Sequence, residues 1–271
     1  MSINNILNRY RGGPDFKKKF QESFYLDRNI KLNLTLPQSN PRKPVSAKTV
    51  NYPFTEPGWF EMHCSRIAHS QYIPILEVYW YYMPFIPLPF DGELGSLRLN
   101  IEISKLSTPS LTSYDLGRTI LKEYDDYYNS DIVGDYNLGR NTEIINDVAA
   151  HSALFDIPFS EEKKKAHINA GINDTGYPKI TDFEEYIFNE AEWIKYTENR
   201  ENNTRKKYVF ATLLDEHYYM TANFTFTINM SHSGKSWYKN ADANIIPMME
   251  GISLTHLEEV KDNLLVNKSI L

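Results

Sequence analysis

The sequence predicts an α+β protein, with antiparallel sheet(s) of about six to eight strands packed with helices, possibly in two β-β-β-α halves. Three observations carry this prediction. Apolar and polar residues alternate strictly from Met220 to Ile228, the pattern of a strand with one buried and one solvent-facing side. An amphipathic helical pattern follows after the polar turn Ser231–Gly234. The order of three strands and one helix also occurs twice along the chain.

The first half of the chain begins with a strand and a connector. Leu32–Leu36 alternates apolar and polar residues and predicts a first strand, and the proline-rich segment Pro37–Pro44 reads as an exposed connector. Three further strands are expected at Trp59–Ile67, Ile73–Met83 and Leu97–Ile103. Leu111–Tyr128 then has its apolar residues on one helical face, with Thr112 or Ser113 as candidate N-cap.

The second half repeats this order after a helical stretch. Short helices are expected at Thr142–Ala150 and Ser160–Ala170, with Gly171–Gly176 ending the second one. Three strands and a helix that begins near Lys235 follow, the strands at Ala191–Thr197, Tyr208–Leu214 and His217–Ile228. The predicted core of this half consists of Phe224, Phe226, Ile228, Trp237, Ala241 and Ile245.

Four segments result from these assignments. Residues 1–50 form a basic N-terminal arm with one strand, and residues 51–135 form the first β-β-β-α half. Residues 136–190 form a helical or loop connector, and residues 191–271 form the second half. A duplicated unit and one composite sheet both fit this order, and the segments can form one composite domain.

Charge is distributed unevenly along the chain. Residues 1–50 carry ten basic and three acidic side chains, a formal +7, which leaves −13 for the rest of a chain whose net charge is −6. The body should therefore repel phosphate backbones and attract basic surfaces, so no nucleic-acid partner is expected. The run Lys17–Lys19 is expected to be a solvated segment that packs on the acidic body.

Cysteine usage and hydropathy indicate the compartment. The single Cys64 cannot form an internal disulfide, which fits a reducing environment. No apolar run long enough for a membrane span or a secretory signal occurs, so neither is expected. The expected location is the cytoplasm, or the periplasm if a leader has been removed.

Reaction motifs are incomplete in this sequence. Gly234-Lys235-Ser236 ends like a phosphate-binding loop, but Asn229 stands where the loop requires its first glycine. The acids near Asp125 do not follow the order of a calcium loop. No catalytic, cofactor or metal residues are therefore assigned, and no enzyme activity is expected.

An aromatic run and a polar turn are the best candidates for contact with a partner. Tyr79–Tyr82 places aromatic side chains on both faces of one strand, where one face must pack the core and the other needs a cover or a partner. Asp215-Glu216-His217 falls at the expected tip of a hairpin.

The last helix carries a family resemblance. The pattern Trp237-x3-Ala241-x3-Ile245-x2-Met248-x2-Gly251, after an alternating aromatic strand, resembles the C-terminal signature of small α+β immunity domains. These domains protect bacteria against type VI secretion toxins, include the lipase-effector immunity family, and belong with PsbP-like and DcrB-like folds. The resemblance covers residues 190–255, and a similar pattern recurs in residues 57–128.

The resemblance implies an immunity protein that binds and neutralises a cognate secreted toxin, without turnover of its own. Self-association is left open. The candidate partner-binding residues are Trp80, Tyr82, Glu123, Asp125, Asp126, Asp131, Asp135, Asp215, Glu216 and His217. Two alternatives stand beside this hypothesis: a hydrolase-type enzyme whose site is assembled from dispersed groups such as His63, Asp215 and His217, or a structural subunit of a secretion or envelope assembly.

Overall fold

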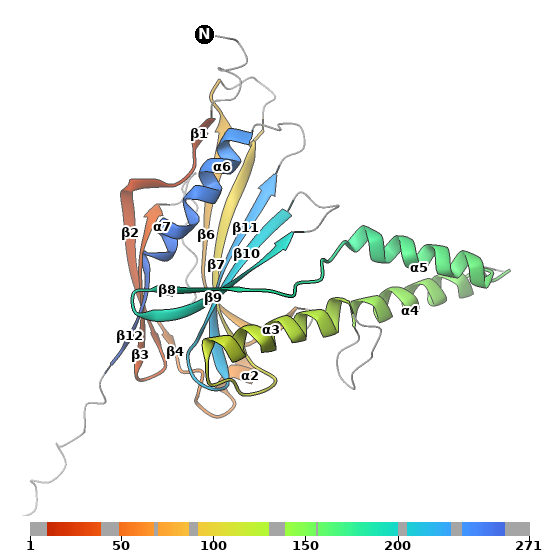
Figure 1. The fold of residues 1–271 in the computed structure, drawn as a ribbon, viewed down its shortest axis with the longest axis horizontal. Coiled ribbons are helices and arrows are strands. Elements are labelled where there is room, and N and C mark those ends of the chain that lie inside the picture. Colours follow the sequence, from red (N-terminus) through yellow and green to blue (C-terminus); the bar gives the residue numbers. More distant parts are fainter. Residues whose placement is uncertain are drawn as a thin grey trace, which may run out of the picture.

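A computed structural model of the chain describes residues 10–38, 49–67, 70–86, 92–129, 139–155, 157–199, 205–228 and 235–257. These residues form two β-sheets and a set of helices (Figure 1). The strand pairs are antiparallel, apart from one short parallel pair in the smaller sheet. Mixed α and β structure with antiparallel sheets is thereby confirmed.

The larger sheet contains strands from both predicted halves of the chain. Its order is β1 (Tyr10–Gly12), β6 (Ser70–Pro84), β7 (Gly95–Lys105), β11 (Tyr218–Ile228), β10 (Arg205–Leu213), β9 (Ala191–Asn199) and β8 (Glu184–Phe188), with β5 (Ser65–Ile67) paired to β6. The strands β7 and β11 pair along their whole length, from Gly95 opposite Ile228 to Lys105 opposite Tyr218. The strands of both expected halves therefore lie in one composite sheet.

The smaller sheet has the order β12 (Ile252–His256), β3 (Ile30–Gln38), β2 (Asp15–Leu26) and β4 (Asn51–Tyr52). Its strand β2 contains Lys17–Lys19, whose side chains are exposed where the register between β2 and β3 shifts. The expectation of a basic arm with one strand was wrong for these residues, because Phe20, Phe24 and Leu26 anchor β2 against the core. The described part of the arm has three strands.

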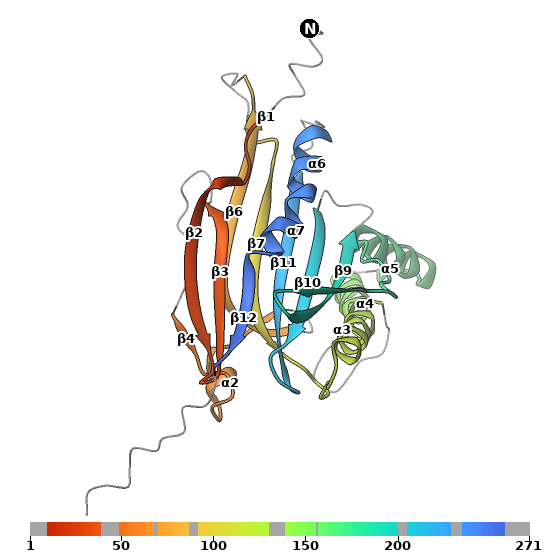
Figure 2. The ribbon, with the colours of Figure 1, turned by 60° about the vertical axis from the view of Figure 1, so that its left-hand side comes forward.

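One face of the large sheet packs against the small sheet and two helices, α6 (Lys235–Ala243) and α7 (Ile245–Met249) (Figure 2). The predicted core residues Phe224, Phe226, Trp237, Ala241 and Ile245 are buried there, and Ile228 packs at the margin. Gly95 permits the close approach of α6, because a Cβ at that position would lie 2.4 Å from the ring of Trp237. We call this the apolar face.

The opposite face of the large sheet is covered in part by α3 (Ser113–Tyr128). Leu116 and Ile120 of α3 pack on Ile194, Ala211 and Tyr219 of the sheet. Thr112 is the N-cap, as expected, and its hydroxyl accepts from the backbone N–H of Asp115 at 3.1 Å. The prediction of a solvated face was wrong at Thr221 and Asn223, which α3 and its neighbours bury. We call this the polar face.

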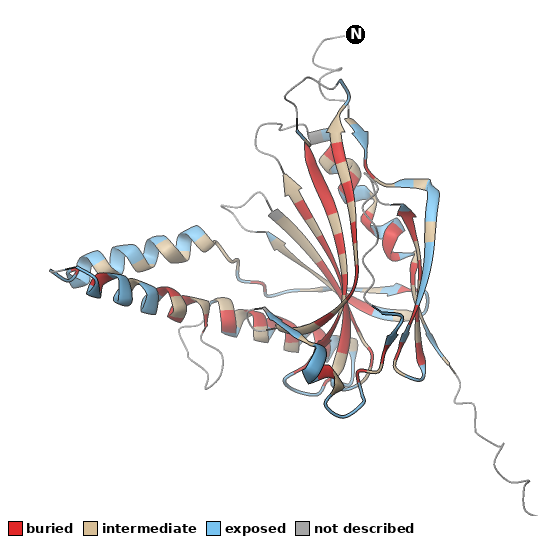
Figure 3. Ribbon diagram, turned by 180° about the vertical axis from the view of Figure 1, so that it is seen from behind, coloured by how far each residue is buried: buried red, intermediate tan, exposed pale blue. Residues whose placement is uncertain are grey.

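Two further helices, α4 (Arg140–Ala153) and α5 (Glu161–Thr175), form a hairpin that projects beyond the sheets (Figure 1). The surface of α5 is exposed or partly exposed along its whole length (Figure 3). The expectation that Gly171 helps to end α5 was wrong, because the helix continues to Thr175. Gly171 instead allows Ile144 of α4 to approach closely; a Cβ at Gly171 would lie 2.9 Å from Ile144. The helix ends at Gly176, whose φ of 54° is left-handed.

The predicted strand Trp59–Ile67 was wrong in its first part. Residues Trp59–His63 form a short helix, α2, and only Ser65–Ile67 is extended. The rings of Trp59 and His63 stack 4.3 Å apart, and His63 Nδ1 lies 2.7 Å from the Trp59 carbonyl oxygen. This contact joins residues four apart, which face each other only in a helix. The described helices include none with the length and apolar character needed to cross a membrane.

Candidate functional site

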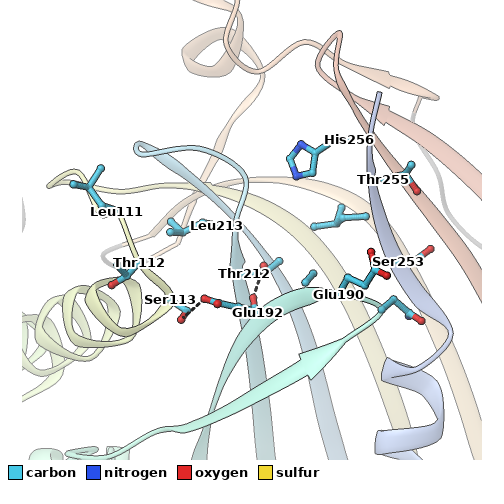
Figure 4. A pocket seen from close by; sticks show the side chains of 13 residues that line it. Leu111, Thr112, Ser113, Glu190, Glu192, Thr212, Leu213, Ser253, Thr255 and His256 are labelled. Atoms are coloured by element: carbon cyan, nitrogen blue, oxygen red, sulfur yellow. Dashed lines mark hydrogen bonds between the residues drawn. The ribbon is translucent and has the colours of Figure 1, made fainter. Parts of the chain in front are cut away.

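A groove of about 730 Å³ lies where the ends of the two sheets meet the start of α3 (Figure 4). Leu111, Thr112 and Ser113 border it on one side, and the turn between β8 and β9 on another. The strand β12 closes the third side, with Ser253, Thr255 and His256 along the wall. Residues from four distant parts of the sequence therefore form one cavity, which we call the acidic groove.

The turn between β8 and β9 is held in an unusual backbone conformation. Asn189 and Glu190 have φ angles of 49° and 68°, in the left-handed region that non-glycine residues rarely adopt. The Asn189 side chain donates to the carbonyl oxygens of Glu250 at 3.0 Å and Ile252 at 2.8 Å. These two hydrogen bonds join the large sheet to β12 and fix the position of Glu190 in the groove wall.

A second carboxylate, Glu192, ties β9 to α3. Its Oε2 atom accepts a hydrogen bond from the Ser113 hydroxyl at 2.9 Å. Its carbonyl oxygen accepts from the buried Thr212 hydroxyl at 2.7 Å. Figure 4 shows both contacts on the groove wall. Glu190 and Glu192 thus give the groove a negative charge on a braced backbone.

Exposed apolar side chains lie beside these carboxylates. Leu111 is 78% exposed, Tyr114 next to Ser113 is 52% exposed, and Ile187, which pairs with Glu192 across the hairpin, is 74% exposed. Exposed apolar side chains that gather on a surface and are rimmed by polar residues are typical of protein-interaction sites. The groove therefore combines negative charge with apolar anchors at its rim.

The predicted hairpin tip lies next to this region. The carbonyl oxygen of Glu216 accepts from the N–H of Ser110 at 2.9 Å, directly before the residues that border the groove. Asp215 Oδ1 accepts from the backbone N–H groups of His217 and Tyr218, at 2.7 Å each, which shapes the turn. Glu216 and His217 are exposed. The tip is thus available to a partner that occupies the groove.

The acids of α3 have partners within the chain. Glu123 accepts from the backbone N–H and the hydroxyl of Ser107. Asp125 lies 3.7 Å from Lys179 Nζ, and Asp126 lies 2.5 Å from Lys122 Nζ. The other two candidate acids, Asp131 and Asp135, fall outside the described residues.

Trp80 and Tyr82 cannot anchor a partner in this structure, which corrects the sequence-based hypothesis. Both side chains have 0% exposure on the apolar face. Trp80 donates its indole N–H to the carbonyl oxygen of Gln38 at 3.1 Å, and the Tyr82 ring contacts the Trp237 ring at 5.0 Å. Tyr79 and Tyr81, on the polar face, are half-buried and stacked on each other.

The groove residues Glu190, Glu192 and His256 were missed by the sequence analysis. Glu190 and His256 are far apart in the sequence, and both adjoining strands, β8 and β12, are five residues long. The concentration of acids between Asp182 and Glu192 was the available signal in the sequence. Among the described residues, no group of three His, Cys, Asp or Glu side chains could hold a metal ion.

His63 and His217, considered for a dispersed catalytic site, have separate roles. His63 is stacked on Trp59 within α2, whereas His217 Nε2 lies 3.4 Å from Glu216 Oε1 at the hairpin tip. Comparison with known proteins gave no relative from which a function could be transferred: no protein-family model and no curated protein sequence matches the chain.

Proposed function

We propose that this chain is an immunity protein that binds a cognate secreted bacterial toxin through the acidic groove and so neutralises it. The acidic groove is the observation that supports this function most directly. Its carboxylates stand on a backbone braced by Asn189 and Thr212, and Leu111 and Ile187 protrude beside them. A braced surface loses little conformational entropy on binding, which favours a tight complex.

The complementary toxin surface should be basic with one or two apolar pockets. Glu190 and Glu192 would face its cations, while Leu111 and Ile187 would fill the pockets, because burying exposed apolar side chains favours association. The formal charge of −13 on residues 51–271 would speed the encounter with such a surface. The hairpin tip, Glu216 and His217, would contact the rim of the same partner.

Co-expression with a cognate toxin, identified by affinity purification from the native host, tests the proposal. The wild-type chain should restore growth, and the combined variant Glu190→Gln, Glu192→Gln and Leu111→Ser should restore it poorly while keeping its thermal unfolding transition. The matched control neutralises two acids of α3, Asp125→Asn and Asp126→Asn, which already pair with lysines. Rescue by the control should fall much less than rescue by the groove variant.

Affinity purification from the native host gives an independent test. A toxin should be recovered with the wild-type chain and lost with the groove variant. Recovery of a small-molecule turnover activity without any toxin partner would overturn the proposal and favour the hydrolase-type alternative. Equal loss of rescue in the groove and α3 variants would move the binding site to the α3 acids of the sequence-based hypothesis.

A further inference from the structure

A second cavity, separate from the acidic groove, lies on the polar face of the large sheet where α3 crosses it. Its volume is about 60 Å³, enough for a few water molecules or a small polar group. Glu102 of β7 and Asn223 of β11 line it side by side, with Lys207 of β10, Glu123 of α3 and the Tyr219 side chain. We call this the Asn223 cavity.

The amide of Asn223 has one polar atom without a hydrogen-bond partner among the residues that the structure describes. The residue is only 6% exposed, and its Nδ2 atom donates to Glu102 Oε2 at 2.9 Å and to Thr221 Oγ1 at 3.0 Å. These contacts fix the orientation of the amide, since the opposite orientation would point its oxygen at the Glu102 carboxylate. The Oδ1 atom is then buried with no hydrogen-bond partner among the described residues. A buried acceptor of this kind calls for a donor that the described chain does not supply.

The charges around the cavity favour a cation as that donor. Glu102 and Glu123 line the cavity, and Lys207 is the one cation among its lining residues. Arg98, farther along β7, lowers the pKa of Glu102 through its positive charge. Among the described residues no ion pair joins the Lys207 ammonium to Glu102, although the charge of Lys207 lowers the pKa of that carboxyl from a distance. Burial raises the pKa of Glu102, and Lys207, Asn100, Arg98 and Asn223 oppose that rise.

We propose that the Asn223 cavity binds a primary ammonium group, either of a small free amine or of a lysine side chain. An ammonium group has three N–H donors and no acceptor, and the cavity presents Asn223 Oδ1, the Glu102 carboxylate and the hydroxyl oxygens of Ser104 and Thr221. Such a ligand would satisfy the orphaned amide oxygen and neutralise the partly buried carboxylate at once. The proposal does not depend on the function of the acidic groove.

Titration with methylammonium, followed through the side-chain amide signals of Asn223 in ¹H–¹⁵N NMR spectra, tests this site. The signals should shift in a saturable manner with methylammonium chloride. Tetramethylammonium chloride, which has the same charge and no N–H donor, should leave them unchanged. A second arm uses Nα-acetyl-lysine N-methylamide: saturable binding there assigns the site to lysine side chains as well, and binding of methylammonium alone assigns it to free amines.

Three variants sharpen the test. Glu102→Gln should weaken methylammonium binding by about tenfold or more, because it removes the countercharge. Lys207→Met should strengthen binding, because it removes a competing cation. Glu185→Gln, the same change at an exposed carboxyl of β8 outside the cavity, should leave the affinity unchanged. Binding should also strengthen as the pH rises through the pKa of Glu102, because only the ionised carboxylate attracts the cation.

Three results would overturn the proposal. The first is the absence of a saturable shift, which would leave only water in the cavity. The second is an equal response to tetramethylammonium, which would mean that the shift does not depend on N–H donors. The third is an affinity that Glu102→Gln and Lys207→Met both leave unchanged, which would place the amine elsewhere on the protein. Since Lys207→Met removes a half-exposed side chain, it remains informative even if Glu102→Gln fails to fold.

Discussion

The two faces of the large sheet are built from the same strands but differ in composition and in covering. On the apolar face, Val78, Trp80, Leu99 and Phe226 pack against the small sheet, α6 and α7, all with 1% exposure or less. On the polar face, neighbouring residues include Glu102, Asn223, Thr225 and Lys207, and α3 covers only part of them. Figure 3 shows the resulting stripes of buried and partly exposed residues.

Because side chains alternate between the two faces of a strand, the apolar core lies on one face of the large sheet and the titratable groups of Glu102 and Lys207 lie on the other. The apolar face excludes water and supplies most of the buried apolar area. Within one small cavity, the polar face holds a partly buried carboxyl, a lysine, and an amide oxygen that no described residue hydrogen-bonds. Changes on the first face should therefore affect folding, and changes on the second should affect ionisation and binding.

The largest expected effect comes from the apolar face. Phe226→Ala should lower the free energy of unfolding by about 3–5 kcal/mol, because the side chain is fully buried between β10 and α6. Its sequence neighbour on the opposite face, Thr225→Ala, should cost less than about 1 kcal/mol. Urea unfolding of both variants measures the contrast, and equal losses would contradict the separation of the faces.

A smaller effect is expected where the two sheets are joined. Asn189→Ala removes two hydrogen bonds to the chain around β12 and places alanine at a φ of 49°, so the loss should be about 1–3 kcal/mol. Asn189→Gly loses the same hydrogen bonds but tolerates the left-handed backbone. The glycine variant should be the more stable of the two in thermal unfolding. The reverse order would show that backbone strain is unimportant at this turn.

The N-cap of α3, the helix that covers part of the polar face, should contribute about 1 kcal/mol to the free energy of unfolding. Thr112→Ala leaves the N–H of Asp115 without its hydroxyl acceptor, which costs about 0.5–2 kcal/mol. The matched change Ser160→Ala removes the N-cap of α5, whose residues are not buried. Global unfolding in denaturant should respond to the first change and hardly at all to the second. A similar response to both would mean that α5 is coupled to the sheets.

The smallest expected effect depends on pH. Because burial raises the pKa of Glu102 in the folded state, the unfolded chain ionises this carboxyl first as the pH rises. The folded state therefore loses stability between the unfolded and the folded pKa of Glu102, and Glu102→Gln should be more stable than the wild type at neutral pH. The advantage should vanish below the unfolded pKa, where both states are protonated. Melting temperatures measured across this range check the sign, with Glu185→Gln, at an exposed carboxyl of β8, as the control.

Regular alternation made the centre of the fold predictable. Met220, Ala222, Phe224 and Phe226 follow one another at every second position, so the strand and its buried face could be assigned from the sequence. The strand β2 was missed because three lysines separate Phe16 from Phe20 and hide the period. The strands β8 and β12 are too short to show a period of their own.

The candidate sites were less predictable, because they depend on which layer covers each face. An aromatic run on both sides of β6 does not reveal that the small sheet covers Trp80 and Tyr82. The acidic groove joins Ser113, Glu190 and His256, which meet only after both sheets have formed. The Asn223 cavity similarly pairs residues from neighbouring strands, Glu102 and Asn223, that are 121 positions apart.

The projecting hairpin of α4 and α5 has a consequence for the dynamics of the molecule. Its helices pack mainly on each other. They are connected to the rest of the molecule through α3 and through the stacked rings of Tyr128, on α3, and Tyr177, which follows α5. Opening of the hairpin would therefore expose little of the core shared by the two sheets. Its backbone amides should exchange with deuterium through local opening, well before those of β7 and β11, which exchange only when the whole sheet unfolds. The protein should thus behave as two cooperative units of unequal stability within one chain.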